Sequence, residues 1–183
     1  MYKRQGDGGA CFTDDEALAT RLREIRNHGQ DRAYHHPRIG INGRMDTIQS
    51  TIILSKMTLF PDEVQKRSQL GARYSELLAE ANCVTPLIAA ENLSVYAQYT
   101  LQVENRQAVR DALQTEGIPS AVYYPITLDQ QPALRDKARI SGNLDTAHTM
   151  QDKVMSLPMH PYLEEVQMQQ ITDCVRQTTC QAD

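Results

Sequence analysis

The sequence predicts an α/β fold, and three kinds of local pattern lead to that prediction. Apolar residues recur at helical spacing in several segments, as at Leu18, Leu22 and Ile25, which indicates helices with one apolar face. Short segments in which apolar and polar residues alternate, such as residues 96–103, are typical of half-buried strands. Glycine and proline separate these segments, so helices and short strands are expected to follow one another along the chain.

The first part of the chain is predicted to contain one short strand and two helices. Residues 10–12 are predicted to form the strand, and Thr13 or Asp14 is predicted to cap a helix that ends at Gly29. After a long polar segment, Asp46 is expected to cap a second helix with an apolar stripe. The residues of that stripe are Ile48, Ile52, Ile53 and Leu59.

A third and longer helix is predicted to begin at Pro61, because proline is favoured in the first turn of a helix. The chain is predicted to divide near Phe60 into residues 1–60 and a small α/β domain of residues 61–183. The further elements predicted in that domain are an edge strand at 84–87, a strand at 96–103, a helix at 106–116, a strand at 120–124, a polar crossover at 128–137, and helices at 143–153 and 164–177.

Composition argues against several classes of protein. The net charge is −4, whereas nucleic-acid-binding proteins normally carry a basic surface, so no nucleic-acid partner is predicted. No apolar run reaches the roughly 18 residues of a membrane-spanning helix, so no membrane partner is predicted either. The four cysteines form no C-x-x-C pair, so a zinc site is not expected, and reduced thiols in a cytoplasmic protein are the simplest interpretation.

The segment from His28 to Gln49 combines polar side chains with backbone-permissive residues, and it lies between the first two predicted helices. A loop this long is usually functional or disordered, although a solvated loop is the simplest interpretation of its composition. The Asn42 amide offers two neutral donors, which suits a phosphate group. Asn42 and Gly43 also form a strong turn dipeptide, so a purely structural role stays open. The planar guanidinium of Arg44 matches a carboxylate or diphosphate, or it pairs with Asp46 at the surface.

Six motifs occur in a specific order: GDGGA at 6–10, HGQDR at 28–32, GINGRMD at 40–46, YAQYT at 96–100, GIPSAVYYP at 117–125 and SLPMHPYL at 156–163. Their order and spacing resemble the PLP-dependent nucleotide-sugar aminotransferases of the DegT/StrS type, which have fold type I. The resemblance covers nearly the whole chain from Gly6 onward. The sub-group that it resembles most aminates a UDP-linked 3-keto-glucuronic acid sugar.

The resemblance implies a cytoplasmic homodimer that uses pyridoxal 5'-phosphate (PLP). It implies transfer of an amino group, usually from glutamate, to a keto sugar nucleotide for bacterial surface polysaccharide biosynthesis. Asn42 would contact the PLP phosphate of the partner subunit, and no metal is implied. Asp129 stands where many members carry His or Asn, and a negative charge there would repel a uronate. The residues expected near the nucleotide-sugar substrate are Arg44, Tyr123, Tyr124 and His28, of which Tyr123 replaces a histidine of close relatives.

In this family the lysine that binds the cofactor covalently precedes the Gly-Asp-Gly-Gly turn. Counted without gaps it would fall just before Met1, and Lys3 is out of register with it. Residues 1–5 resemble a translated sequencing adaptor and are interpreted as a cloning or assembly scar. We therefore expect residues 1–60 to be a remnant of the PLP-binding large domain and residues 61–183 to be the small C-terminal domain. Without the lysine these residues hold no catalytic group and are expected to be inactive; the alternative is a non-catalytic nucleotide-sugar-binding or dimerisation module.

Overall fold

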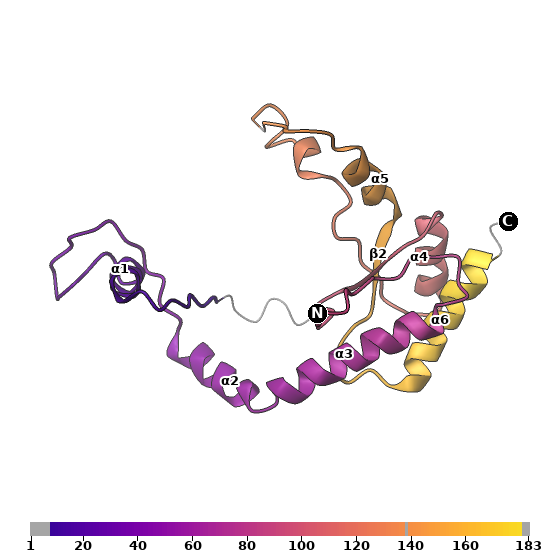
Figure 1. Ribbon diagram of the computed structural model, residues 1–183, viewed down its shortest axis with the longest axis horizontal. Coiled ribbons are helices and arrows are strands. Elements are labelled where there is room, and N and C mark those ends of the chain that lie inside the picture. Colours follow the sequence, from indigo (N-terminus) through magenta and orange to yellow (C-terminus); the bar gives the residue numbers. More distant parts are fainter. Residues whose placement is uncertain (1–7, 138, 181–183) are drawn as a thin grey trace. The chain divides into compact units, whose positions relative to one another are not determined.

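The structure is a computed structural model, and it describes residues 8–137 and 139–180. The expectations for residues 1–5 and for the turn at Gly6 and Asp7 lie outside these residues. The chain divides into two compact units, Met1–Phe60 and Pro61–Asp183, and Figure 1 labels their helices and strands. Among the described residues, no helix combines the length and apolar character that crossing a membrane requires.

The first unit contains two helices connected by a long polar loop. Helix α1 covers Glu16–Arg26 and helix α2 covers Thr47–Met57. Asp15 caps α1, because its carboxylate accepts a hydrogen bond of 3.0 Å from the backbone N–H of Leu18. The cap therefore lies one residue beyond the predicted pair, and Thr13 instead accepts a hydrogen bond from the backbone N–H of Asp15.

Two features predicted for the first unit differ from the structure. The strand predicted at residues 10–12 is wrong, because these residues are irregular and no neighbouring strand in the described chain supplies hydrogen-bond partners. Asp46 stands at the start of α2 as predicted, but its side chain makes no capping hydrogen bond. Neither α1 nor α2 contains a buried residue, so the predicted apolar stripe of α2 is exposed to solvent in this unit.

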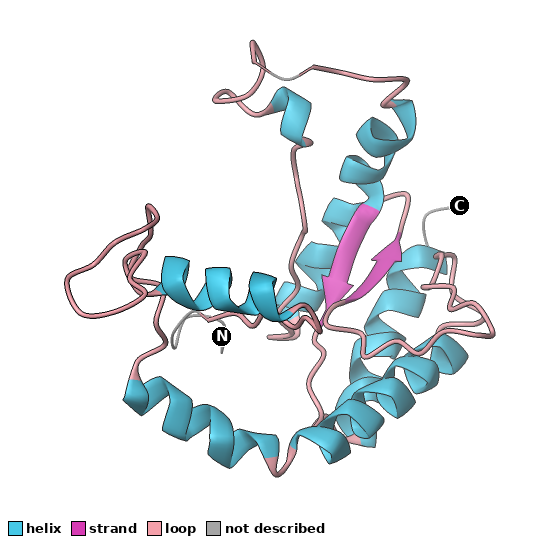
Figure 2. Ribbon diagram, turned by 60° about the vertical axis from the view of Figure 1, so that its left-hand side comes forward, coloured by secondary structure: helices cyan, strands magenta, loops and turns pink. Residues whose placement is uncertain are grey.

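The second unit packs helices against a small antiparallel sheet, whose two strands are visible in Figure 2. It begins with α3, and Pro61 lies in the first turn of that helix as predicted. Helix α3 covers Phe60–Leu77. The elements that follow it are β1 (Tyr99–Gln102), α4 (Arg106–Thr115), the 3₁₀ helix η1 (Leu128–Gln130), α5 (Asp145–Lys153), β2 (Val154–Leu157) and α6 (Glu165–Cys180).

The register of the sheet places its apolar residues on one face. Tyr99 pairs with Leu157 and Leu101 with Met155, and all four side chains are buried. Side chains alternate between the two faces of a strand, so these four residues face the core together with buried residues of α3, α4 and α6. The intervening Thr100 pairs with Ser156, and their hydroxyl oxygens lie 2.8 Å apart.

The sheet is shorter than predicted. The predicted strands at 84–87 and 120–124 are each reduced to one bridge, Val84 with Gln102 and Ala121 with Ser156, on the two sides of the β1–β2 pair. Strand β2 was not predicted, because it follows α5 directly and no glycine or proline separates the two elements. The helices agree more closely: α4 ends near Gly117, whose φ is 70°, as predicted.

Candidate functional site

The loop between α1 and α2 is held by backbone hydrogen bonds to the end of α1. The Ile41 N–H donates to the Ile25 carbonyl at 2.9 Å, and the His28 N–H donates to the Ile41 carbonyl at 2.9 Å. The Gly43 N–H donates to the Arg26 carbonyl at 2.8 Å. The returning chain at residues 41–43 is therefore paired with the C-terminal end of α1 and has a defined backbone.

Two glycines allow the loop to fold so closely on itself. Gly29 has φ of 75°, and a Cβ atom there would lie 1.9 Å from the Arg38 carbonyl oxygen. A Cβ atom at Gly40 would lie 2.1 Å from the Gly29 nitrogen. No side chain fits at either position without moving the backbone. By contrast, the nearest atoms to a Cβ atom at Gly43 would be side-chain atoms of Ile41 at 3.5 Å and the Arg26 Cα at 3.6 Å, which is ordinary van der Waals contact.

Asn42 lies in this paired segment, opposite Asn27. It is exposed, and its side chain makes no hydrogen bond within the described residues. A turn of the Asn-Gly type needs positive φ, which neither Asn42 nor Gly43 has, so the turn interpretation of this dipeptide is wrong. The Asn42 amide is thus a neutral donor group with open hydrogen-bonding capacity on a fixed backbone, and this donor chemistry fits a phosphate.

The other predicted site residues of the loop are arranged around the same pairing. Arg44 donates from Nη1 to the Asn27 side-chain oxygen at 2.7 Å, rather than pairing with Asp46. His36 donates a hydrogen bond of 2.8 Å from Nδ1 to the His28 carbonyl. His35 contacts the Asp31 carboxylate at 2.6 Å, but the described residues contain no group of three or more His, Cys, Asp or Glu side chains that could hold a metal ion.

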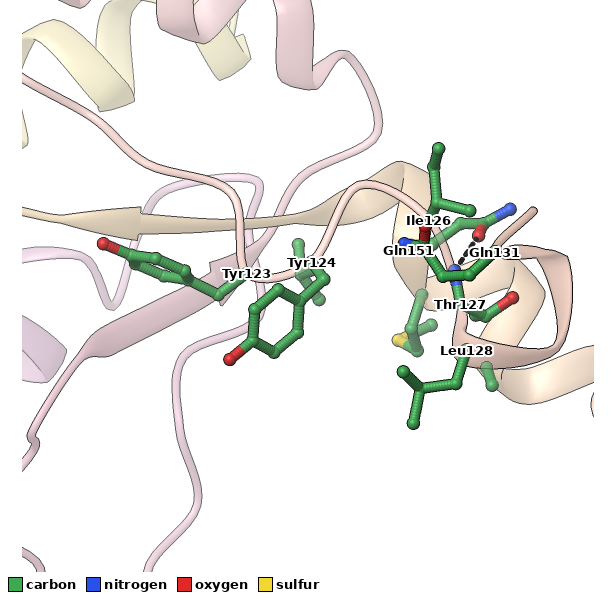
Figure 3. Close-up of a pocket in the computed structure, with 10 residues that line it drawn as sticks. Tyr123, Tyr124, Ile126, Thr127, Leu128, Gln131 and Gln151 are labelled. Atoms are coloured by element: carbon green, nitrogen blue, oxygen red, sulfur yellow. Dashed lines mark hydrogen bonds between the residues drawn. The ribbon is translucent and has the colours of Figure 1, made fainter. Parts of the chain in front are cut away.

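The second unit contains a pocket of about 560 Å³ (Figure 3). Tyr123 and Tyr124 lie at one end of it, with ring centroids 6.0 Å apart and planes inclined at 77°. Tyr124 is 74% exposed, so its ring is open to a ligand. Every lining residue is uncharged: Tyr123, Tyr124, Ile126, Thr127, Leu128, Gln131, Ala147, Met150, Gln151 and Val154.

Asp129 lies next to this pocket but is not one of its lining residues. Its carboxylate accepts a hydrogen bond of 2.9 Å from His148 Nε2. The neighbouring side chains of Thr127 and His148 hold the pKa of Asp129 below its ordinary value. The Asp129 carboxylate, whose charge was expected to repel a uronate, is therefore hydrogen-bonded to His148 on α5.

Two residues of the second unit were missed by the sequence analysis. Gln151 accepts a hydrogen bond of 3.0 Å from the Thr127 N–H, so it connects α5 to the opposite wall of the pocket. Arg67 on α3 donates to the carbonyls of Val95 and Tyr96 at 2.9 and 2.5 Å, and its burial lowers its pKa. Both residues are polar positions on amphipathic helices, and nothing in their local pattern distinguishes them from solvated surface residues.

Residues 4–176 match the DegT/DnrJ/EryC1/StrS aminotransferase family. The chain belongs to this family. It is 47% identical over 159 residues to UDP-2-acetamido-2-deoxy-3-oxo-D-glucuronate aminotransferase of Pseudomonas aeruginosa, a match that covers 87% of the chain and 44% of the relative. It is 36% identical over 173 residues to a UDP-N-acetyl-3-dehydro-alpha-D-glucosamine 3-aminotransferase of Acidithiobacillus ferrooxidans, covering 94% and 46%.

The crystal structure of a DegT DnrJ EryC1 StrS aminotransferase from Brucella abortus superposes with a TM-score of 0.87 and 37% identity. The match covers 92% of the chain and 45% of that structure. These findings confirm the predicted family and the predicted fold class, an α/β portion of a fold type I transferase. The chain spans less than half the length of each of these relatives.

Proposed function

We propose that these residues belong to a PLP-dependent aminotransferase that transfers an amino group, from a donor such as glutamate, to a keto sugar nucleotide. Membership of the aminotransferase family over residues 4–176 is the observation on which this proposal rests. Because the chain covers 44% of its Pseudomonas aeruginosa relative, the activity is proposed for the full-length protein. We place that protein in the cytoplasm, as a homodimer that serves bacterial surface polysaccharide biosynthesis.

PLP would supply the electron sink for transamination, while the protein holds its phosphate and places the substrate. In this chain Asn42 is the residue proposed to hold the phosphate, in the site of the partner subunit. Its exposed amide has open donors, and the close approach of Gly29 and Gly40 fixes the loop that carries it. The lysine that binds the cofactor is proposed to precede Gly6, and we assign no catalytic group to the described residues.

We propose that the pocket residues Tyr123 and Tyr124 contact the sugar of the substrate, and that Arg44 and His28 contact its diphosphate. Arg44 uses Nη1 to bind Asn27, which holds its guanidinium in place and leaves the other N–H groups for an anion. A UDP-linked 3-keto-glucuronic acid is the proposed substrate, in line with the relative from Pseudomonas aeruginosa. The uncharged pocket lining contains no carboxylate that would repel a uronate.

The substitution Asn42→Ala in the full-length protein tests the phosphate contact. Hydrogen bonds to charged groups contribute about 1.5–3 kcal/mol, so PLP retention should weaken by roughly 10- to 150-fold. Cofactor absorbance after equilibrium dialysis measures this retention. Asn92→Ala is the matched control, because Asn92 is an exposed asparagine of the other unit and should leave retention unchanged. Equal retention in both variants would contradict the assigned role of Asn42.

Mixed dimers test whether Asn42 acts across the subunit interface. The Asn42→Ala protein is combined with a full-length variant that lacks the cofactor-binding lysine, and each parent should be impaired. In the mixed dimer one site keeps its own lysine and the partner's intact asparagine, so activity should return. If Asn42 serves the site of its own chain, no site is intact and activity stays low.

A further inference from the structure

Helix α5 and the segment of residues 126–131 form facing walls of the pocket (Figure 3). The helix side of the pocket is lined by Ala147, Met150, Gln151 and, just after the helix, Val154. This spacing of three, four and seven residues places their side chains on one face. The segment contributes Ile126, Thr127, Leu128 and Gln131 from the other side.

Two polar contacts fasten this segment to α5. The Thr127 N–H donates to Gln151 Oε1 at 3.0 Å, and His148 Nε2 donates to Asp129 Oδ2 at 2.9 Å. The first contact joins a backbone donor to a side-chain acceptor, and the second joins two side chains. They lie two residues apart on the segment and three apart on the helix. We call this pair of contacts the loop latch. Among the described residues, the other backbone hydrogen bonds of residues 127–131 stay within that segment or reach residues just after it.

The helix end of the latch is itself anchored to the core of the unit. Arg106 donates from Nη1 to the backbone carbonyls of Gln151 and Val154. Arg106 is the first residue of α4, whose Val109 and Leu113 are buried. The latch therefore ties the segment to a helix whose C-terminal end is hydrogen-bonded to Arg106 of α4.

We propose that Gln151 and His148 are positioning residues of the substrate pocket. Through Thr127 and Asp129 they hold residues 126–131 in place as a wall of the pocket, and this sets its affinity for the substrate. The latch also directs the Asp129 carboxylate toward His148, so the charge is occupied and an acidic substrate meets an uncharged lining. The identity of that substrate rests on the function proposed above, whereas the latch itself does not.

Hydrogen exchange of the ligand-free chain tests the latch with two matched pairs of variants. Gln151→Met removes the acceptor for the Thr127 N–H, while Gln151→Glu keeps it. Asp129→Ala removes the acceptor for His148, while Asp129→Asn keeps it. Each disruptive variant should raise amide exchange in residues 126–131 about five-fold, equivalent to about 1 kcal/mol, and each conservative variant should preserve protection. Exchange in β1 and β2 should stay unchanged in all four variants.

Two results would overturn the latch. Unchanged exchange of residues 126–131 in Gln151→Met and Asp129→Ala would show that these hydrogen bonds do not hold the segment. An equal rise in the conservative and disruptive variants, extending to β1 and β2, would show general destabilisation instead.

Binding of UDP-glucuronate to the full-length protein then tests the positioning role. The disruptive variants should raise its dissociation constant about five-fold, and the conservative variants should restore it. UDP-glucose, whose sugar carries no carboxylate, serves as the comparison probe. Comparing Asp129→Asn with wild type reports whether the Asp129 charge affects binding of UDP-glucuronate. Unchanged affinity in variants that have lost protection would overturn the positioning role. If the wild-type protein binds neither probe, the function proposed for the pocket is wrong, while the exchange ratios still report the latch.

Discussion

Helices α2 and α4 are similar in length, yet only α4 buries its apolar residues. In α4, Val109 and Leu113 are 1% and 0% exposed, because α6 and the sheet cover them. In α2 no residue is buried, and Leu54 is 70% exposed. The second unit is thus held by a core, whereas the loop of the first unit is held by backbone contacts. An apolar stripe predicts which face of a helix needs cover, but it does not show that the same unit provides it.

The same substitution in these two helices should give very different losses of stability. Leu113→Ala leaves a cavity in the core and should lower the free energy of unfolding by about 2–5 kcal/mol. Leu54→Ala removes an exposed side chain and should change it by less than about 0.5 kcal/mol. Urea unfolding followed by far-UV circular dichroism measures both values. Similar losses in the two variants would mean that α2 is covered in solution, and the contrast between the units would fail.

Within the first unit, Gly40 packs closely against neighbouring backbone atoms, whereas Gly43 does not. Gly40→Ala should open the loop, because the added Cβ would lie within 2.6 Å of three backbone atoms and force a shift that costs about 1–3 kcal/mol. Amide exchange at Ile41 should then rise roughly 5- to 150-fold. Gly43→Ala is the control, with only side-chain atoms of Ile41 and one backbone atom of Arg26 near the new methyl group, all at 3.5 Å or beyond. Equal protection in both variants would show that the loop is not fixed by this approach.

The smallest change in stability is expected when the pH is lowered. Glu165 accepts hydrogen bonds from Arg73 at 2.6 and 3.0 Å, and this lowers its pKa below the ordinary 4.5. The pair joins α6 to α3, and its stabilisation is present above pH 4.5 and is lost as the pH falls through the lowered pKa. Glu165→Gln should therefore lose less stability than wild type between pH 6 and pH 3, as urea midpoints would show.

The first unit supplies the comparison for this acid effect. His35 lowers the pKa of Asp31 through a hydrogen bond of 2.6 Å. These two residues are only four positions apart in the loop of the first unit, so their pair does not connect elements of the second unit. Asp31→Asn should therefore leave the acid response of the second unit unchanged. An effect of Asp31→Asn as large as that of Glu165→Gln would indicate that acid acts through net charge rather than through individual pairs.

The helices were largely predictable because their signals are local. The start of α3 next to Pro61 and the end of α4 near Gly117 both follow from the backbone preferences of single residues. The strands were less predictable, because a strand is defined by partners that are distant in sequence. Val84 and Ala121 each find one bridging partner, while residues 10–12 find none in the described chain.

For the candidate site, the sequence identified residue types better than contacts. Asn42 and the tyrosine pair were named from motifs, and the structure places the two tyrosines together at one pocket. The partners of Arg44 and Asp129 were not predictable, because Asn27 and His148 meet them only after the chain has folded. The role of Asn42 stays a prediction.

The pairing of Tyr99 with Leu157 also has a consequence during protein synthesis. Strand β1 leaves the ribosome well before β2, because α4, η1 and α5 are made between them. At about 5–20 residues per second, β1 waits roughly 3–12 s for its partner. During that interval Tyr99 and Leu101 lack the cover that β2 supplies, and the edge of β1 that later pairs with β2 is open to association with other chains. The helices between the strands can form meanwhile, since their contacts are local.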